Sequence, residues 1–552
     1  MAKERALAGF SVGVLIGLPW LALSYAANQI AGVPLLPFEF FELITRLLPG
    51  GLVTVGIEVM IRVVNALQIG PTASTGKLAE FIMAYALTWL FLILLAVLYA
   101  LTLGTMRFHW VLRGLVAGAI LWLFCMGLAG WSGGGQAGAI PTALWLAILN
   151  AAWGIALAWG VDQVSRAQSG IEDPNRRQAI AQLTIGSLIL SGIAAGLGRW
   201  LTPPEEEKPI QIADIPPGTP TLTPNPTPTP PPTEEGFIPV EGTRAELTPM
   251  TDFYRVDINL LPPDKNDFER ETDSLTERLR AQGGLLDMPS DAYLLSVDGL
   301  VENQLTLSLT DLRSFSPVNQ YATLECISNP VGGDLISTTN FTGARLRDVL
   351  DRAGLLQEAI DIKFTCVDGY TESLPIESAM DPRTLLCYNM GNEPLTQSHG
   401  SPLRLYTPNR FGMKNPKWII KIEAVNEDYH GYWVQRGWNE QAWVQTTSVI
   451  DTTQPDGTGR TEIGGIAFAG DRGVDRVELR IDDGEWAQAE LDRALSKLTW
   501  VLWRISLEIP PGEHQIWVRA IDGAGEAQLE QVRSTHPDGA TGYHARTVEI
   551  ES

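Results

Sequence analysis

Five long apolar runs in the first 200 residues constrain this chain more than any other feature of its sequence. A bilayer core of about 30 Å requires about 20 apolar residues in helical conformation. Runs of this length cover residues 6–25, 78–103, 111–130, 141–161 and 180–201. The sequence therefore predicts an α-helical transmembrane domain over residues 1–201.

The stretch over residues 35–67 is apolar but carries charges that would be costly facing lipid, namely Glu39, Glu42, Arg46, Glu58 and Arg62. We therefore expect it either not to cross the bilayer or to cross it twice. Positive residues favour the cytoplasmic side, and they occur in the groups Lys3 and Arg5, Arg107 and Arg113, and Arg166, Arg176 and Arg177. Five crossings place all three groups in the cytoplasm and the C-terminal part outside. The expected location is thus a membrane that borders the cytoplasm, with an extracytoplasmic soluble part.

Two features of the membrane part admit more than one interpretation. Arg176 and Arg177 precede the last run and resemble a twin-arginine export signal, but an ordinary positive-inside flank explains them as well. His109 is a single histidine near a membrane boundary. Because a bis-histidine haem needs two facing imidazoles, we interpret His109 as an interfacial residue.

Residues 202–245 form a Pro/Thr-rich linker, with Thr-Pro-Thr-Leu-Thr-Pro-Asn-Pro-Thr-Pro-Thr-Pro-Pro-Pro at its centre. Such a composition favours extended polyproline conformations and a semi-rigid spacer. Most of the acidic residues follow this linker, and the net charge of the chain is −23. A nucleic-acid partner is excluded by this balance, because phosphate binding requires a basic face.

Residues 246–448 predict an α+β domain. Strand-like alternation begins at Leu294 and at Leu305, and further strands are expected at 362–367, 385–389 and 403–407. Residues 344–354 predict an amphipathic helix ended by Gly354. Residues 449–552 are all-β in character, with alternating runs that begin at Val474, Trp500 and His514. About a hundred residues of short strands predict an immunoglobulin-like sandwich.

Two segments of the α+β domain carry candidate chemistry. Cys326 lies where a strand runs into the Gly-rich turn Ser-Asn-Pro-Val-Gly-Gly-Asp. A soft thiolate there suits a transition metal, although a buried structural cysteine is the ordinary alternative. The run 398–418 gathers His399, Arg404, Arg410, Lys414 and Lys417 around glycines. Such a cluster suits a phosphate-bearing ligand, and a solvated basic loop explains it equally well.

Together these segments resemble the sulfite oxidase family of molybdopterin-dependent oxidoreductases, in its membrane-anchored bacterial type, over residues 253–552. Cys-Ile-Ser-Asn at 326–329 resembles the family's Cys-x-x-Asn, and Tyr-Thr-Glu-Ser-Leu-Pro at 370–375 resembles its Tyr-x-x-Ser-x-Pro. Met-Gly-Asn-Glu-Pro-Leu at 390–395, followed by residues 399–404 and 412–418, is similar to its pterin-binding run. The C-terminal sandwich looks like the family's dimerisation domain, which implies a possible homodimer.

The resemblance also implies a cofactor and roles for individual residues. The cofactor would be a molybdenum-molybdopterin with one pyranopterin, which supports oxygen-atom transfer on a small substrate. Cys326 would ligate molybdenum, and Tyr370 would lie beside the metal and donate a hydrogen bond to an oxo or substrate oxygen. The cofactor-binding residues would be Asn329, His399, Arg404, Lys414 and Lys417.

The chain departs from the family pattern in two places. Pro330, Val331, Gly332 and Gly333 stand where sulfite oxidases commonly have substrate-binding arginines. A sulfite pocket is therefore in doubt, so an oxidase of a sulfur compound competes with an S-oxide or N-oxide reductase. The family's cofactor-contacting histidine near the domain start is also absent, and Arg255 is its candidate replacement.

Three further expectations follow. Because the sequence contains no haem or iron–sulfur ligand set, the enzyme requires a separate electron carrier, a cytochrome or a quinone. We expect Cys366 and Cys387 to form a disulfide, since both lie on predicted neighbouring strands in an oxidising compartment. An interpretation from another class is a cofactor-less, membrane-tethered binding module on the same fold.

Overall fold

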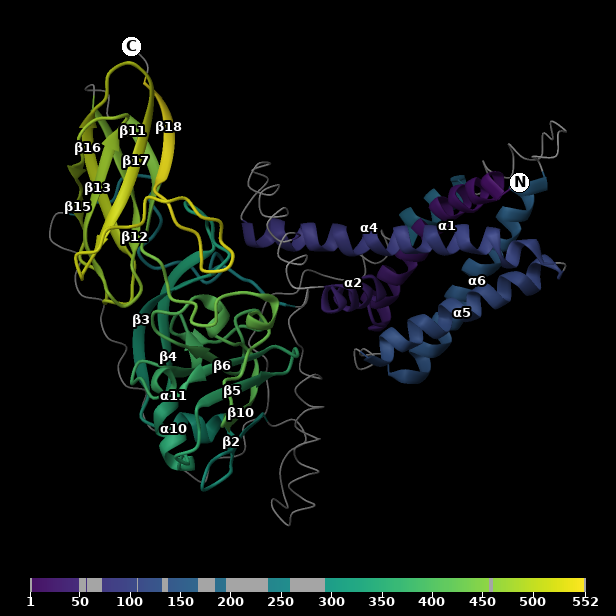
Figure 1. Ribbon diagram of the computed structural model, residues 1–552, viewed down its shortest axis with the longest axis horizontal. Coiled ribbons are helices and arrows are strands. Elements are labelled where there is room, and N and C mark those ends of the chain that lie inside the picture. Colours follow the sequence, from purple (N-terminus) through teal and green to yellow (C-terminus); the bar gives the residue numbers. More distant parts are fainter. Residues whose placement is uncertain are drawn as a thin grey trace. The chain divides into compact units, whose positions relative to one another are not determined.

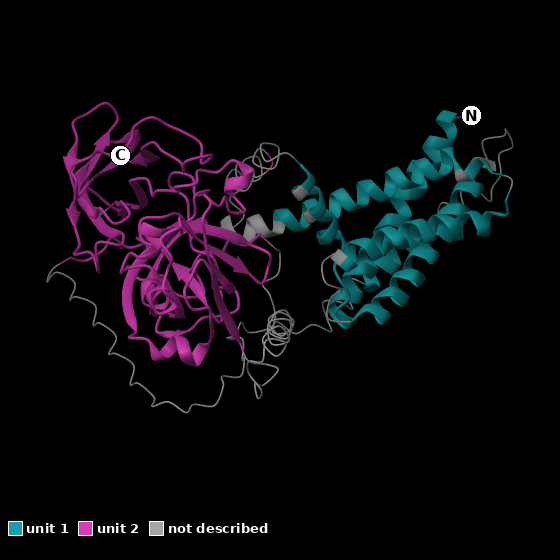
Figure 2. Ribbon diagram, turned by 60° about the horizontal axis from the view of Figure 1, so that its bottom comes forward, with its two compact units in different colours: residues 1–49, 76–206 teal, residues 50–75, 207–552 magenta. Residues whose placement is uncertain are grey.

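The computed structural model describes residues 2–48, 56, 72–106, 108–131, 138–166, 184–194, 237–258, 293–455 and 460–550. The chain divides into two compact units, residues 1–49 with 76–206, and residues 50–75 with 207–552 (Figure 2). The Pro/Thr repeat and the Arg176–Arg177 pair lie outside the described residues.

The first unit is helical. Its helices are α1 (Ala2–Ala31), α2 (Leu36–Leu47), α4 (Thr72–Leu101), α5 (Trp110–Trp131) and α6 (Ala139–Arg166), with a 3-10 turn η1 at Leu103–Thr105. Four of them, α1, α4, α5 and α6, are long and apolar enough to cross a membrane. Four of the five predicted runs are thus confirmed as such helices. The fifth is described only as a shorter apolar helix, Thr184–Ala194, so the five-crossing topology stays a prediction. In the weaker stretch, α2 is too short to cross a bilayer alone, and nearly all of the remainder lies outside the described residues.

Helices α5 and α6 approach each other closely through small residues. A Cβ atom built on Gly154 of α6 would lie 2.2 Å from the Gly114 carbonyl oxygen and 2.7 Å from the Gly118 nitrogen of α5. Membrane helices gain little from the hydrophobic effect between them, so such close backbone contact is a main source of their packing energy.

A Gly154→Val substitution is therefore expected to separate α5 from α6 and to lower the stability of the helical unit. Overpacking of this kind costs about 1–3 kcal/mol. Gly127→Val on α5 is the matched control, because a Cβ there meets nothing within 4 Å. Thermal unfolding of the full chain in detergent measures both, and equal unfolding temperatures for the two variants would contradict the prediction.

The part of the second unit that precedes residue 447 contains two five-stranded sheets (Figure 1). The first has the order β2-β1-β10-β5-β6, and the second has the order β3-β4-β7-β8 with β9 paired to β7. All pairs are antiparallel except β1 with β10. The first sheet consists of β1 (Leu294–Gly299), β2 (Leu305–Ser308), β5 (Asp361–Cys366), β6 (Thr371–Pro375) and β10 (Ile419–Val425). The second consists of β3 (Val318–Glu325), β4 (Ile336–Arg345), β7 (Leu385–Met390), β8 (Glu393–Pro394) and β9 (Arg404–Tyr406).

Short helices complete this α+β part and confirm the predicted fold class. They are α9 (Leu309–Ser314), α10 (Leu346–Ala353) and α11 (Ile376–Ala379), with 3-10 turns η3 (Gly412–Lys414) and η4 (Val434–Arg436). Helix α10 matches the predicted helix over 344–354. It buries residues at helical spacing (Leu346, Val349, Leu350 and Ala353) and ends at Gly354, whose φ of 71° suits glycine.

The C-terminal part contains two four-stranded antiparallel sheets, β11-β12-β16-β15 and β14-β13-β17-β18. Their strands are β11 (Thr447–Pro455), β12 (Arg460–Phe468), β13 (Val474–Ile481), β14 (Ala487–Gln488), β15 (Glu490–Leu491), β16 (Val501–Glu508), β17 (Gly512–Asp522) and β18 (His544–Ile550). One core shared by both sheets includes Ile463, Leu479, Trp503 and Val518. The all-β character is confirmed, while the immunoglobulin-like arrangement stays a prediction.

The predicted disulfide between Cys366 and Cys387 is wrong. Both are free, buried thiols. Cys366 ends β5 of the first sheet and Cys387 lies in β7 of the second, so the two strands are not neighbours. Each thiol packs into a different hydrophobic core. The error arose from strand pairing, because sequence proximity does not decide which strands share a sheet.

The folded part also begins earlier than the predicted boundary at residue 246. Phe237 is buried, and Arg244 forms an ion pair with Asp451 of the C-terminal part, with a 3.0 Å distance between Arg244 Nε and Asp451 Oδ1. The indole of Trp500 donates a hydrogen bond to the Glu246 carbonyl at 2.9 Å. The segment 237–258 is thus bound into the second unit.

Candidate functional site

Cys326 lies at the end of β3, where the chain turns toward β4. Its backbone N–H donates to the Leu335 carbonyl, and its carbonyl accepts from the Asn329 N–H, both at 2.9 Å. The side chain is buried, and its Sγ lies 3.1 Å from the Ser328 hydroxyl oxygen. Burial raises the pKa of this thiol. Binding to a metal cation would have the opposite effect and stabilise the thiolate.

Asn329 holds the turn that carries Cys326. Its amide oxygen accepts from the Leu335 N–H at 3.0 Å, and its amide nitrogen donates to the Glu325 carboxylate at 2.9 Å. A Cβ on Gly333 would lie 2.3 Å from that amide oxygen, so the turn requires glycine there. The contacts of Asn329 are thus internal to the turn. They fix the position of Cys326, and a direct contact of Asn329 with a cofactor remains a prediction.

Tyr254 reaches the same place from the segment that follows the linker. A Cβ on Gly412 would lie 2.6 Å from the Tyr254 hydroxyl oxygen and 3.7 Å from the Cys326 Cα. Burial and the nearby Cys326 raise the pKa of Tyr254, so its hydroxyl stays protonated. Phe253 stacks beside Tyr254 and presents an edge to His399, with ring centroids 5.5 Å apart. These aromatic contacts join the Cys326 turn to the predicted pterin-binding run.

The structure brings together four of the predicted cofactor residues, Arg255, His399, Arg404 and Lys417. Asp257 forms ion pairs with both Arg255 and Lys417. Arg404 donates to the His399 carbonyl at 3.1 Å. Burial lowers the pKa of Lys417 to about 8 and that of Arg404 below its ordinary value. Burial, with the charges of Lys417 and Arg404, lowers the pKa of His399 to about 3, so its imidazole is neutral.

Among the described residues, the cations of this cluster gather around one ionised carboxylate. Arg255, Arg404 and Lys417 face the carboxylate of Asp257, and burial raises the pKa of the neighbouring Asp368 to about 7, so that this second carboxyl is only partly ionised. The buried Nε of Arg404 has no hydrogen-bond partner among the described residues. A buried guanidinium with an unsatisfied N–H, beside a second buried cation, fits a phosphate-bearing ligand. The residues present therefore fit a molybdopterin phosphate.

Lys414 lies apart from this cluster. Its ammonium pairs with Glu372 at 2.7 Å and donates to the Ser373 carbonyl at 3.2 Å, and both charged side chains are fully buried. Glu372 also accepts from the Tyr370 hydroxyl at 3.2 Å, and the same hydroxyl lies 2.7 Å from the Met413 carbonyl oxygen. Burial raises the pKa of Glu372 and of Tyr370. Tyr370 is thus held by the carbonyl of Met413. The preceding residue, Gly412, is the one that lies against Tyr254 and the Cys326 backbone.

Three residues of this site were not predicted from the sequence: Tyr254, Asp257 and Glu372. Asp257 stands two positions after Arg255 in Arg-Val-Asp, which is a detectable acidic neighbour of a predicted cation. Glu372 lies inside the Tyr-x-x-Ser-x-Pro segment. Nothing in the local sequence indicates that Tyr254 contacts the Cys326 turn, because that contact joins distant parts of the chain.

Arg404→Gln is expected to weaken cofactor retention about 10- to 100-fold, since a hydrogen bond to a charged group contributes about 1.5–3 kcal/mol. The molybdenum-to-protein ratio of the purified full chain measures the loss. Arg519→Gln is the control, because Arg519 pairs with Glu478 in the C-terminal part, far along the chain from this cluster. Unchanged molybdenum content in Arg404→Gln would show that Arg404 does not hold the cofactor.

Comparison with known proteins agrees with this geometry. Residues 283–433 match the family model of the oxidoreductase molybdopterin binding domain, and residues 438–536 match the Mo-co oxidoreductase dimerisation domain. Human mitochondrial sulfite oxidase is 30% identical over 299 residues, which covers 45% of this chain and 55% of that protein. The Arabidopsis thaliana sulfite oxidase is 27% identical, covering 44% of this chain and 78% of that protein.

A bacterial relative is similar over most of its own length. The uncharacterized oxidoreductase YuiH of Bacillus subtilis is 30% identical over 145 residues, which cover 26% of this chain and 71% of that protein. In contrast, the chain spans about half the length of the mammalian sulfite oxidases that it matches.

The match to the molybdopterin binding domain covers the Cys326 turn and the run from His399 to Lys417, but not Arg255 and Asp257. The matches imply a molybdenum-molybdopterin cofactor and a molybdenum-dependent oxidoreductase. The chain belongs to the sulfite oxidase family of molybdopterin-dependent oxidoreductases.

Proposed function

We propose that this chain is a membrane-anchored enzyme that transfers an oxygen atom to or from a small sulfur-containing substrate outside the cytoplasmic membrane. The observation that carries the proposal is a buried thiol, Cys326, joined by Phe253 and Tyr254 to the cluster of Arg404 and Lys417, in which the buried Nε of Arg404 has no hydrogen-bond partner among the described residues. Thiolate ligation and phosphate binding are the two requirements of a molybdopterin site.

The residues of the chain divide this work between them. Cys326 would ligate the metal, and Arg255, Arg404 and Lys417 would bind the cofactor phosphate. His399, whose lowered pKa keeps it neutral, would contact the pterin as a hydrogen-bonding group without adding charge. When bound, the cofactor supplies two-electron redox chemistry and the exchange of an oxygen atom, while the protein supplies orientation and electrostatics.

Tyr370 would act beside the metal as a positioned hydroxyl. The single hydrogen of this hydroxyl donates either to the Met413 carbonyl at 2.7 Å or to Glu372 at 3.2 Å, which leaves the oxygen lone pairs available to a substrate or water hydrogen. To donate to a substrate oxygen, as the family resemblance implies, the hydroxyl would have to exchange one of these acceptors for the substrate. The Lys414–Glu372 pair thereby sets the orientation of Tyr370.

The substrate is expected to carry little negative charge. The turn after Cys326 contains Pro330, Val331, Gly332 and Gly333 in place of arginines. A neutral S-oxide, reduced by the enzyme, is therefore an alternative to sulfite or another sulfur compound that the enzyme oxidises.

The helical unit and the C-terminal domain bear on the location and the partners of the enzyme. Four apolar helices support a membrane anchor. We propose that the anchor places the second unit on the extracytoplasmic side and near its electron carrier, a cytochrome or a quinone. The match to a dimerisation domain supports a homodimer.

A substrate screen on the full chain in detergent tests the proposal. Sulfite with an artificial acceptor, and sulfoxides or N-oxides with an artificial donor, are assayed after molybdenum and pterin have been quantified. We expect about one molybdenum per chain and turnover of a sulfur compound. A chain that folds but retains no molybdenum under adequate supply would instead favour a cofactor-less binding module.

A further inference from the structure

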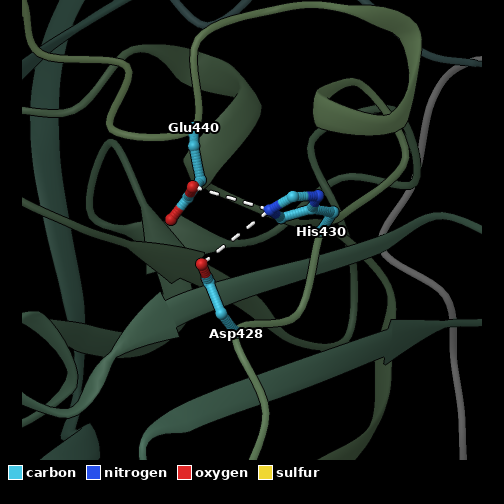
Figure 3. A group of neighbouring side chains, drawn as sticks. All are labelled: Asp428, His430 and Glu440. Carbon is cyan, nitrogen blue, oxygen red and sulfur yellow. Dashed lines mark ion pairs between the residues drawn. The ribbon is translucent and has the colours of Figure 1, made fainter.

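A loop between β10 and β11 gathers three possible metal ligands outside the proposed cofactor site (Figure 3). The Nε2 of His430 lies 3.9 Å from Oδ2 of Asp428 and 3.7 Å from Oε2 of Glu440. One donor atom from each of the three residues lies within 4.8 Å of the others. The loop thus turns one imidazole nitrogen and two carboxylate oxygens toward a common point.

These distances do not describe hydrogen bonds. N–H···O hydrogen bonds reach about 3.2 Å, and both contacts of His430 are longer. His514 shows the contrast, since its ring nitrogens lie 2.7 Å from Asp482 Oδ2 and 3.0 Å from the Pro510 carbonyl. With bonds of about 2.0–2.2 Å, neighbouring ligands of a tetrahedral zinc ion are about 3.4 Å apart. The two His430 contacts exceed this spacing by about 0.3–0.5 Å, and the carboxylate oxygens of Asp428 and Glu440 lie within 4.8 Å of each other, so small rotations of exposed side chains bring the three donors to such an ion.

The accessibility of the donors also suits a metal ion. The side chains of His430, Asp428 and Glu440 are 53%, 65% and 33% exposed, so an ion can enter and water can complete its coordination. The two carboxylates would neutralise a divalent ion. An imidazole ligand favours first-row transition ions and zinc over calcium or magnesium, which prefer oxygen ligands alone.

The loop that carries these three residues packs against Glu372 and Tyr370 of the proposed active site. The backbone at Gly431 packs against Glu372, since a Cβ there would lie 2.4 Å from Oε1 of that carboxylate. The next residue, Tyr432, donates its N–H to the Thr371 carbonyl at 2.8 Å and lies beside Tyr370, with ring centroids 5.8 Å apart. An ion bound by both His430 and Glu440 would therefore restrict the motion of the loop that packs against Tyr370.

We propose that Asp428, His430 and Glu440 form a site for one divalent first-row cation, with zinc as its best probe, and that the bound ion fixes this loop against β6. None of the three residues is among those assigned to the molybdopterin cofactor, and zinc binding by them does not depend on the proposed reaction. Its ligands come from both ends of the segment 428–440, so the ion would restrict that segment as a cross-link does.

Zinc binding to the full chain in detergent tests the proposal. After chelator treatment, equilibrium dialysis with Zn²⁺ is expected to load one ion per chain at this site. His430→Asn and Glu440→Gln are each expected to weaken its binding at least about tenfold, since even outer-shell changes at metal sites cost about 10- to 100-fold. Zinc should also slow amide hydrogen exchange of residues 428–440 in the parent chain but not in His430→Asn.

Two matched variants make the outcome specific. His514→Asn changes a partly buried histidine that pairs with a carboxylate by hydrogen bonding, and it should leave zinc binding unchanged. Cys326→Ser should retain this zinc ion, which separates the site from adventitious binding at the proposed molybdenum ligand. Equal zinc binding by the parent chain and His430→Asn, or equal protection of the loop by Ca²⁺, would overturn the proposal.

Discussion

Replacing Cys326 by serine is expected to abolish substrate turnover by the full chain while leaving its fold intact. The thiolate would be the protein's ligand to molybdenum, and a serine hydroxyl is a harder and much less acidic donor. Because outer-shell changes at metal sites already cost about 10- to 100-fold, loss of the ligand itself should lower activity by at least about 100-fold. Steady-state rates, normalised to molybdenum content, measure this effect.

Cys387→Ala is the control for the loss of a buried thiol. Cys387 is fully buried in β7 and is not part of the proposed machinery. We expect this variant to retain activity, and both variants to unfold within a few degrees of the parent chain. Full turnover by Cys326→Ser, at normal molybdenum content, would refute the assignment of the metal ligand.

Lys414→Met is expected to destabilise the second unit by about 3–5 kcal/mol, because it leaves the Glu372 carboxylate buried without its cation. The single variant should also lose activity, since the Tyr370 hydroxyl is oriented by the same carboxylate. Thermal unfolding of the full chain measures the loss of stability, and assays with the substrate found in the screen measure the loss of activity.

The double variant Glu372→Gln with Lys414→Met provides the control. It removes both charges, so most of the lost stability should return, as it does when a buried ion pair is replaced by neutral groups. If Lys414→Met were as stable as the parent, or if the double variant lost the sum of two independent effects, the pair would not be coupled as described. Retention of molybdenum by Lys414→Met would further show that Lys414 does not hold the cofactor.

The sequence predicted local elements well because their signals are local. The helix over 344–354 shows apolar residues at helical spacing and a glycine at its end, and it forms as α10. The strands expected at 362–367 and 385–389 form as β5 and β7. Which sheet each strand joins depends on contacts between distant residues, and this is why the disulfide between Cys366 and Cys387 was predicted wrongly.

The candidate site shows the same division between local and distant information. The run 398–418 predicted a group of cations, and three of its members, His399, Arg404 and Lys417, do lie together. Lys414 lies in the 3-10 turn η3 and forms an ion pair with Glu372. Lys417 forms an isolated antiparallel β-bridge with Arg404 through the backbone, and its side chain forms an ion pair with Asp257. Composition gave the charges of these lysines but not their partners, because Glu372 and Asp257 come from other parts of the chain.

The segment 237–258 has a consequence for release of the enzyme from its anchor. It contributes Tyr254 beside Cys326 and Asp257 beside Lys417, yet it precedes the matched family domain, which starts at residue 283. Proteolysis within the Pro/Thr repeat, upstream of residue 237, would liberate a soluble fragment with the whole cofactor site. Proteolysis between residues 258 and 283 would leave the site residues 237–258 on the membrane side of the cut. The shorter fragment would lack at least residues 237–258, and only the longer one would carry every residue assigned to the cofactor.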